Sequence, residues 1–164
     1  MDEVAVMMLE DRYRSHGIND GYVYGAPKLV VDGERRAFEF DGKTQYLELN
    51  ARAADMGQIT VDIALKHEGP GAQTVFDFGS SPDNCFVLRI AQNGKPEFAA
   101  KVGGKTVAAL TGKKALTKSA WTRLRVEIDG KQIALWVDDK LSTKKASKFR
   151  PADVFPSGRA KRNF

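Results

Sequence analysis

Two short segments of the sequence carry paired carboxylates. Glu39 and Asp41 lie two positions apart in FEFDGKTQYLEL, residues 38–49. Glu127 and Asp129 repeat this spacing in VEIDGKQIAL. On a strand, such a pair shares one face and could act as nucleophile and acid in glycoside hydrolysis. In both segments, however, Gly-Lys follows the aspartate, which is typical of a turn. We therefore predict two strand-ending turns and no catalytic residues.

Other reactive motifs are scarce. The only histidines and cysteine are His16, His67 and Cys85, and they lack the spacing of a zinc site. The Gly-Lys-Thr or Gly-Lys-Lys sequences have no glycine five residues before their Gly-Lys, so none is a phosphate-binding loop. No apolar run approaches the roughly 18–20 residues of a membrane span, and we expect no membrane insertion.

The charge is unevenly distributed. Residues 1–100 contain ten Lys/Arg and sixteen Asp/Glu, whereas residues 101–164 contain sixteen and five. A basic half can form a surface for polyanions, or simply a solvated face. The candidate basic ligands are Arg123, Arg125, Lys144, Lys145 and Lys148. No aromatic interleaving or nucleic-acid motif accompanies them, so we expect no nucleic-acid partner.

Alternating hydrophobicity predicts an all-β domain. ITVDIALKH (59–67), FVLRI (86–90), WTRLRVEID (121–129) and IALWVDD (133–139) alternate apolar and polar residues, as half-buried strands do. Shorter strands are expected at 36–41, 44–49, 73–79, 96–102 and 105–110. Asp41-Gly42, Asn93-Gly94, Gly103-Gly104 and Asp129-Gly130 each separate two such runs and suit tight hairpins. This pattern is typical of an antiparallel sandwich or barrel.

These segments carry a family resemblance. GINDGYVYGAPKLVVDGERRAFEFDGKTQYLEL resembles the opening of a laminin G-like (LamG-like) jelly roll of the concanavalin A-like lectin/glucanase superfamily. ITVDIALKH, TVFDFGS and WTRLRVEIDGKQIALWVDDKL resemble later strands in order, so the resemblance covers about residues 17–141. It implies an antiparallel two-sheet β-sandwich formed by one domain, 1–164, of a larger multidomain protein.

The sequence departs from the family pattern at its end. Asp139 stands where the family usually has glycine, and no closing strand close to I-D-E-V-R-I-Y precedes the final SGRAKRNF. The resemblance therefore implies that the closing strand lies outside this sequence or comes from another chain. MDEVAVMML shows no signal peptide, so an exported parent would carry its signal elsewhere.

The resemblance also implies a function. Glucanases of the superfamily use E-x-D-x-x-E, and both segments of this chain break that motif at its third carboxylate, so we expect no enzyme. We expect a non-catalytic module of an extracellular or periplasmic protein that binds a glycan or a protein, with basic residues favouring acidic glycans. The alternatives are a structural sandwich that packs on neighbouring domains or is completed by a partner strand, and, less favoured, a glycoside hydrolase.

Two ligand sites remain open at this level. Trp136 could stack against a sugar ring, or a loop or another layer could cover it. Jelly rolls of this kind often hold structural calcium, and Asn19, Asp20 and Asp41 fall in the matching region. Ordinary turn hydrogen bonding is the alternative for these three residues.

Overall fold

The computed structural model describes residues 21–49, 53–69 and 71–155. The elements are β1 (Gly21–Tyr24), β2 (Lys28–Asp32), β3 (Arg35–Glu39), β4 (Tyr46–Leu49), β5 (Ile59–Lys66), β6 (Gln73–Ser81), β7 (Asn84–Ile90), β8 (Pro96–Val102), β9 (Lys105–Thr111), β10 (Trp121–Ile128), β11 (Gln132–Val137), β12 (Lys140–Ala146) and the 3-10 helix η2 (Pro151–Val154).

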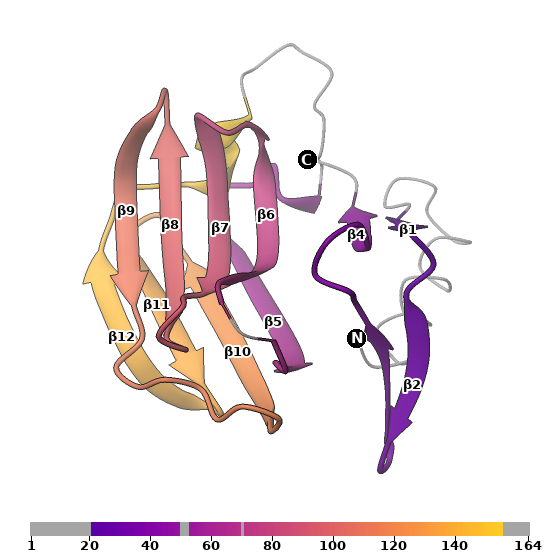
Figure 1. Cartoon of the computed structure of the whole chain (residues 1–164). Helices are drawn as coiled ribbons and strands as arrows, with labels where there is room; N and C mark the ends of the chain where they lie inside the picture. Colours follow the sequence, from indigo (N-terminus) through magenta and orange to yellow (C-terminus); the bar gives the residue numbers. More distant parts are fainter. Residues whose placement is uncertain (1–20, 50–52, 70, 156–164) are drawn as a thin grey trace.

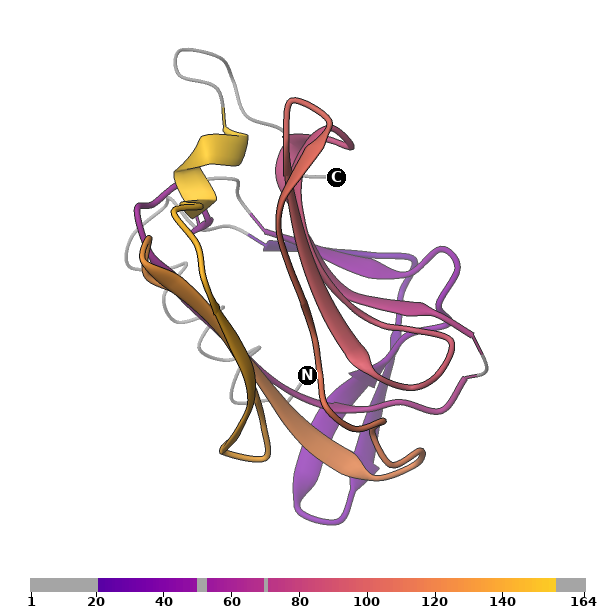
Figure 2. The same cartoon turned by 90° about the vertical axis from the view of Figure 1, so that its left-hand side faces the viewer.

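Two four-stranded antiparallel sheets form a sandwich. One sheet has the order β12-β11-β10-β5 and the other β6-β7-β8-β9. Figure 1 shows the second sheet in front of the first, and the edge-on view in Figure 2 shows the two layers, with η2 near one end of the sandwich. The predicted two-sheet sandwich is therefore confirmed.

The core lies between these sheets, as the alternation predicts. Leu124, Val126 and Ile128 of β10 are at most 1% exposed, and Phe86 and Phe98 from the opposite sheet are equally buried. Burying a side chain of this size contributes about 1.5–3 kcal/mol. The other residues of each strand point outward and form the two outer faces of the sandwich.

Three of the four predicted hairpins are confirmed. Asn93-Gly94 joins β7 to β8, Gly103-Gly104 joins β8 to β9, and Asp129-Gly130 joins β10 to β11, and each of these strand pairs is antiparallel. Gly130 has a φ of 76°, a conformation that other residues adopt only at a cost.

The fourth predicted hairpin is wrong. Asp41-Gly42 forms a turn, but the strands on either side of it do not pair with each other. β3 pairs with β2, and β4 pairs with β1. Two separate ribbons result beside the sandwich (Figure 1). The hairpin turn that the sequence analysis missed lies between Asp32 and Arg35, at the tip of the β2–β3 ribbon.

The β2–β3 ribbon is attached to the sandwich by its tip. The Asp32 carboxylate accepts hydrogen bonds from Lys66 Nζ at 2.8 Å and from Trp121 Nε1 at 2.9 Å. The guanidinium of Arg35 lies 5.1 Å from the centre of the Trp121 ring. Lys66 ends β5 and Trp121 begins β10, so the ribbon contacts one end of the first sheet. These bonds to Asp32, first of all the one from Lys66, lower its pKa.

Each sheet of the sandwich has two edge strands among the described residues, β12 and β5 in one sheet and β9 and β6 in the other. β5 and β6 are terminal strands of their sheets, with no further strand hydrogen-bonded beyond them in this part of the chain. The closing strand was expected outside this sequence or from another chain, so the described residues do not test that prediction. No helix among the described residues is long and apolar enough to span a membrane.

Candidate ligand-binding face

The outer face of the sheet β12-β11-β10-β5 brings together several of the predicted ligand residues. Antiparallel register sets Arg125 opposite Trp136 and Glu127 opposite Ala134. Thr60 of β5 lies on the other side of Glu127, and Lys144 of β12 lies opposite Ala134. Aromatic, charged and hydroxyl side chains therefore share one surface, which we call the outer face.

Trp136 and Arg125 form the central pair of the outer face. The guanidinium carbon of Arg125 lies 4.8 Å from the centre of the Trp136 ring, a cation–π arrangement. Trp136 is half-buried, and its Nε1 has no hydrogen-bond partner within the described chain. Arg125 Nε also lies 3.3 Å from Glu127 Oε1, an ion-pair distance without hydrogen-bond geometry. Arg125 thus covers part of the indole, and the two side chains present one mixed surface.

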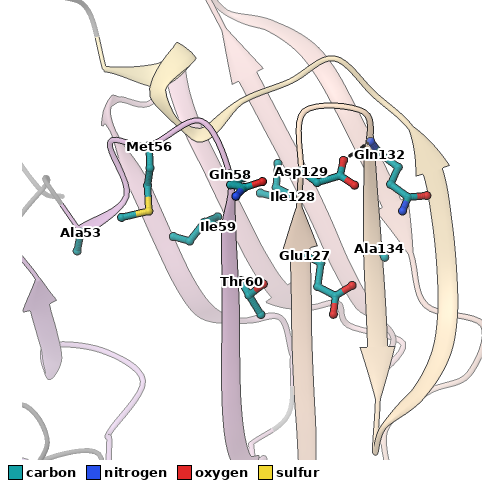
Figure 3. Close-up of a pocket in the computed structure, with 10 residues that line it drawn as sticks. All are labelled: Ala53, Met56, Gln58, Ile59, Thr60, Glu127, Ile128, Asp129, Gln132 and Ala134. Carbon is teal, nitrogen blue, oxygen red and sulfur yellow. Dashed lines mark hydrogen bonds between the residues drawn. The ribbon is translucent and has the colours of Figure 1, made fainter.

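A hollow of about 640 Å³ lies at one end of this face. The polar lining comes from five residues (Figure 3). Gln58 directly precedes β5, Thr60 lies on β5, Glu127 lies on β10, Asp129 lies in the turn after β10, and Gln132 lies on β11. Ala134, Ile59 and Met56 supply apolar surface. Ala134 and Trp136 are two residues apart on β11 and share its outer side, so the hollow and the Arg125–Trp136 pair belong to one surface.

Arg123 is engaged elsewhere on this sheet. Its Nε and Nη2 bond the two carboxylate oxygens of Asp62 at 2.8 and 2.7 Å, a bidentate ion pair. Nη1 adds a contact to Asp139 at 3.3 Å, and the bonds with Asp62 are the main cause of the raised pKa of Arg123. Asp139 has a φ of 60°, so it occupies the left-handed conformation that glycine takes in the family pattern. Arg123 therefore holds the β11–β12 turn against β5.

Two of the three candidate lysines, Lys144 and Lys145, lie on the edge strand β12, and Lys148 follows the end of that strand. Lys144, Lys145 and Lys148 are all exposed. Lys144 lies on the outer face, whereas Lys145 pairs with Ile133, whose side chain points into the core. Lysines along an edge strand also discourage pairing with other strands. Of these three lysines, only Lys144 adds charge directly beside Ala134, and the residue of β12 opposite Trp136 is Leu141.

The two carboxylate segments have the geometry of turns. Asp129 Oδ1 accepts from the amides of Lys131 at 2.8 Å and Gln132 at 2.7 Å, and these bonds lower its pKa. Asp41 Oδ1 likewise accepts from the amides of Lys43 and Thr44, at 2.8 and 2.9 Å. Both aspartates are therefore held as anions, with Oδ1 bonded to amides of their own turns, which does not suit a catalytic acid.

The described residues offer little to a calcium ion. Asp41 uses Oδ1 for three amides, including that of Gln45, and Oδ2 for the Thr44 hydroxyl at 2.9 Å. Asn19 and Asp20 lie outside the described residues. The described part of the chain holds no cluster of three or more His, Cys, Asp or Glu side chains suited to a metal. The calcium site therefore stays a prediction, since two of its three expected ligands, Asn19 and Asp20, lie outside the described residues.

A comparison with protein families decides the relationship. The family model described as "Laminin G domain" matches residues 72–156. The chain belongs to the laminin G domain family. No curated protein matches the sequence.

Solved structures share the fold of this laminin G domain. It resembles domain 4 of an extracellular GH43 arabinanase from Geobacillus stearothermophilus, in complex with arabinotriose (TM-score 0.65, 14% identity, 89% of this chain and 73% of that one). It also resembles carbohydrate-binding module CBM66 from Bacillus subtilis (TM-score 0.53, 15% identity, 80% of this chain and 81% of that one). A third match is the CBM40 of Ruminococcus gnavus IT-sialidase, bound to α2,3-sialyllactose (TM-score 0.55, 18% identity, 64% of this chain and 62% of that one).

Sequence analysis missed part of the outer face of this laminin G domain. It did not single out Gln58, Thr60 or Gln132, nor predict that Arg125 covers Trp136. The second point could not be predicted either, because a two-residue turn at Asp129-Gly130 would set Arg123 opposite Trp136, whereas the observed register has Ile128 opposite Ile133 and therefore Arg125 opposite Trp136. The hollow could not be predicted from the sequence, because its shape depends on where the loop before β5 lies.

Proposed function

We propose that this laminin G domain is a non-catalytic carbohydrate-binding module whose ligand lies along the outer face. The observation that carries the proposal is the Arg125–Trp136 pair continuing into a hollow with polar walls. An aromatic ring packs against the C–H faces of a sugar, while amide, hydroxyl and carboxylate groups bond its hydroxyls. The combination of flat apolar surface and dispersed polar groups is typical of a saccharide site.

Each side chain has a distinct part in this proposal. The exposed portion of the Trp136 ring supplies stacking surface. Arg125 donates N–H groups to ring or carboxylate oxygens at the same position. Gln132 and Glu127 hydrogen-bond sugar hydroxyls in the hollow, and Lys144 would favour a glycan with carboxylate or sulfate groups by charge attraction.

The three solved structures of similar fold support this proposal. Two are carbohydrate-binding modules, and the third is a domain of an extracellular arabinanase in complex with arabinotriose. By analogy, we propose that the domain serves a larger extracellular protein as an accessory module. Identity is low in each case, so the choice of sugar has to come from this chain's own residues.

Affinity electrophoresis in gels containing polygalacturonate, heparin, arabinan or xylan tests the proposal. We expect retardation by at least one polymer. Trp136→Ala should bind that polymer with about tenfold lower affinity, which corresponds to a loss of about 1.4 kcal/mol of binding free energy. Val107→Ala is the matched control, because Val107 is exposed on β9 of the other sheet. Lys144→Ala should weaken binding to the acidic polymers only, and this effect should shrink at high salt. Unchanged retardation of Trp136→Ala would refute a site on the outer face.

A structural role is the second candidate. Leu29 and Val31, both on one face of β2, are 51% and 70% exposed, and β5 and β6 have open edges within the described residues. Such surface can pack on a neighbouring domain or accept a partner strand. This role predicts no retardation by any polysaccharide. It also predicts that Leu29→Ser with Val31→Ser weakens association with the rest of the parent protein.

A further inference from the structure

Exposed aromatic residues gather on the β1–β4 ribbon, a sheet separate from the one that carries the outer face. Tyr22, Tyr24 and Tyr46 are 58%, 40% and 48% exposed. A tyrosine normally buries most of its ring and leaves its hydroxyl near water. Three half-exposed rings on a two-stranded ribbon therefore form an exposed aromatic surface within the described part of the chain.

The register of the ribbon puts these rings on one face. Tyr24 pairs with Tyr46 and Tyr22 pairs with Glu48, so all four side chains leave the same side of the ribbon. The rings of Tyr24 and Tyr46 are stacked, with centres 4.6 Å apart and planes 16° from parallel. Val23, Leu47 and Leu49 take the other face. We call the first face the tyrosine platform.

Glu48 adds a hydrogen-bonding anion to the tyrosine platform. A hydrogen bond from the Tyr24 hydroxyl to Glu48, followed by the negative charge of that carboxylate, raises the pKa of Tyr24. Among the ion pairs of the described residues, none involves Glu48. The carboxylate can thus accept further hydrogen bonds while keeping Tyr24 protonated.

We propose that the tyrosine platform is a second saccharide-binding site, selective for neutral glycan chains. The rings offer flat, stiff surfaces for sugar C–H groups, and three phenol hydroxyls with one carboxylate match the donors and acceptors of sugar hydroxyls. Acidic glycans are disfavoured, because the one charged side chain of the platform is an anion. A protein partner is less well matched, because hydroxyl and carboxylate groups interrupt the apolar surface.

This site differs from the outer face in its charge. The outer face carries both signs of charge, Arg125 and Lys144 together with Glu127, whereas the one charged side chain of the tyrosine platform is Glu48. Binding at the platform should therefore persist at high salt, while acidic-glycan binding at the outer face should weaken. The two sites can be separated by ligand and by substitution.

Affinity electrophoresis with neutral arabinan, xylan, galactan and β-glucan, in parallel with polygalacturonate, tests the platform in the full chain. We expect retardation by at least one neutral polymer, weakened about tenfold or more by Tyr22→Ala. Tyr22→Phe, which keeps the ring, should lose threefold or less. Phe40→Ala is the matched control, because Phe40 is an exposed aromatic residue outside the platform. Circular dichroism of each variant verifies that the fold is retained.

Several outcomes would overturn the proposal. These are no retardation by any neutral polymer, equal losses in Tyr22→Ala and Phe40→Ala, or neutral binding that Trp136→Ala abolishes and Tyr22→Ala leaves intact. If Tyr22→Ala disturbs the fold, the double variant Tyr22→Phe with Glu48→Gln tests the proposal instead. The combined loss of hydroxyl and charge must then weaken binding to neutral polymers more than either single substitution does. Equal binding of this double variant and the natural sequence would count against the platform.

Discussion

The two Asp-Gly-Lys segments have the same local chemistry and different outcomes. Asp41 and Asp129 each accept hydrogen bonds from the amides two and three residues later. Around Asp129, the flanking strands pair directly, with Ile128 opposite Ile133. Around Asp41, the flanking strands pair with other partners. The turn residues therefore fix a bend, and something else decides whether the bend closes a hairpin.

Burial of the flanking residues accounts for the difference. Ile128 and Ile133 are each 1% exposed and belong to the core between the sheets. Phe40, next to Asp41, is 38% exposed and contributes nothing to that core. Strand register is strongly specified where one face is buried and weakly where it is not. The bend at Asp41 is instead closed by side chains, since the Asp41 amide donates to Gln45 Oε1 at 2.8 Å.

The largest effect expected from this comparison concerns the flanks themselves. Ile133→Ala should cost about 2–5 kcal/mol of unfolding free energy, because it leaves a cavity between the sheets. Phe40→Ala should cost less than about 1 kcal/mol, as exposed substitutions usually do. Urea unfolding followed by tryptophan fluorescence measures both values. Similar losses in the two variants would contradict the claim that burial separates the two segments.

The same reasoning explains how much of the fold could be predicted. Strands such as Ile59–Lys66 and Trp121–Ile128 were predicted almost to the residue, because period-2 alternation directly reflects burial on one face. The pairing of β4 with β1 was missed. Its two strands lie more than twenty residues apart, and the nearer strand, β3, looked equally suitable from its local pattern.

The candidate site was predictable only in part. Trp136 and Arg125 could be singled out by residue type, but their pairing depends on the observed register, with Ile128 opposite Ile133, which a two-residue Asp-Gly turn would not give. The engagement of Arg123 with Asp62 could not be foreseen, because these residues are 61 positions apart and meet only through the pairing of β10 with β5. The tyrosine platform was missed for the same reason, since Tyr22 and Tyr24 face Glu48 and Tyr46 only in the paired ribbon.

The next effect concerns the glycines that follow the two aspartates. Gly42 and Gly130 have φ values of 68° and 76°, where an alanine costs about 1–2 kcal/mol. A Cβ at Gly42 would meet open space, and one at Gly130 would meet Arg150 at an ordinary 3.6 Å, so neither site adds a clash. Gly130→Ala should therefore lower the global unfolding free energy by about 1 kcal/mol. Gly42→Ala should instead leave it nearly unchanged.

Hydrogen exchange separates these two outcomes. In Gly42→Ala, the cost should appear as faster exchange of the Lys43 and Thr44 amides, which bond Asp41. Exchange in β10 and β11 should remain as in the natural sequence, because local opening does not require global unfolding. A drop in global stability equal to that of Gly130→Ala would show that the bend at Asp41 unfolds together with the sandwich.

The smallest effect is the response of the two bends to acid. The amides of Lys43 and Thr44, with the Thr44 hydroxyl, lower the pKa of Asp41 to about 2. Its unfolded value is near 3.9. A lowered carboxyl pKa stabilises the bend fully above the unfolded value, and this contribution is lost as the pH falls from about 4 to 2. The pKa of Asp129 is lowered in the same direction by the amides of Gln132 and Lys131.

Nuclear magnetic resonance can follow both bends during acidification. The chemical shift of the Lys43 amide should report the protonation of Asp41, with an apparent pKa of about 2. Protection of the Thr44 and Gln45 amides from hydrogen exchange should fall as Asp41 takes up its proton. The chemical shift of the Lys131 amide should likewise report the protonation of Asp129. The amides of β10 and β11 should stay protected, because Ile128 and Ile133 remain buried. Thr44→Val removes one donor and should move the pKa of Asp41 toward 4. A natural Asp41 that titrates near 4, or loss of protection in both bends together, would contradict the division between a bend held by its own hydrogen bonds and a hairpin held by the core.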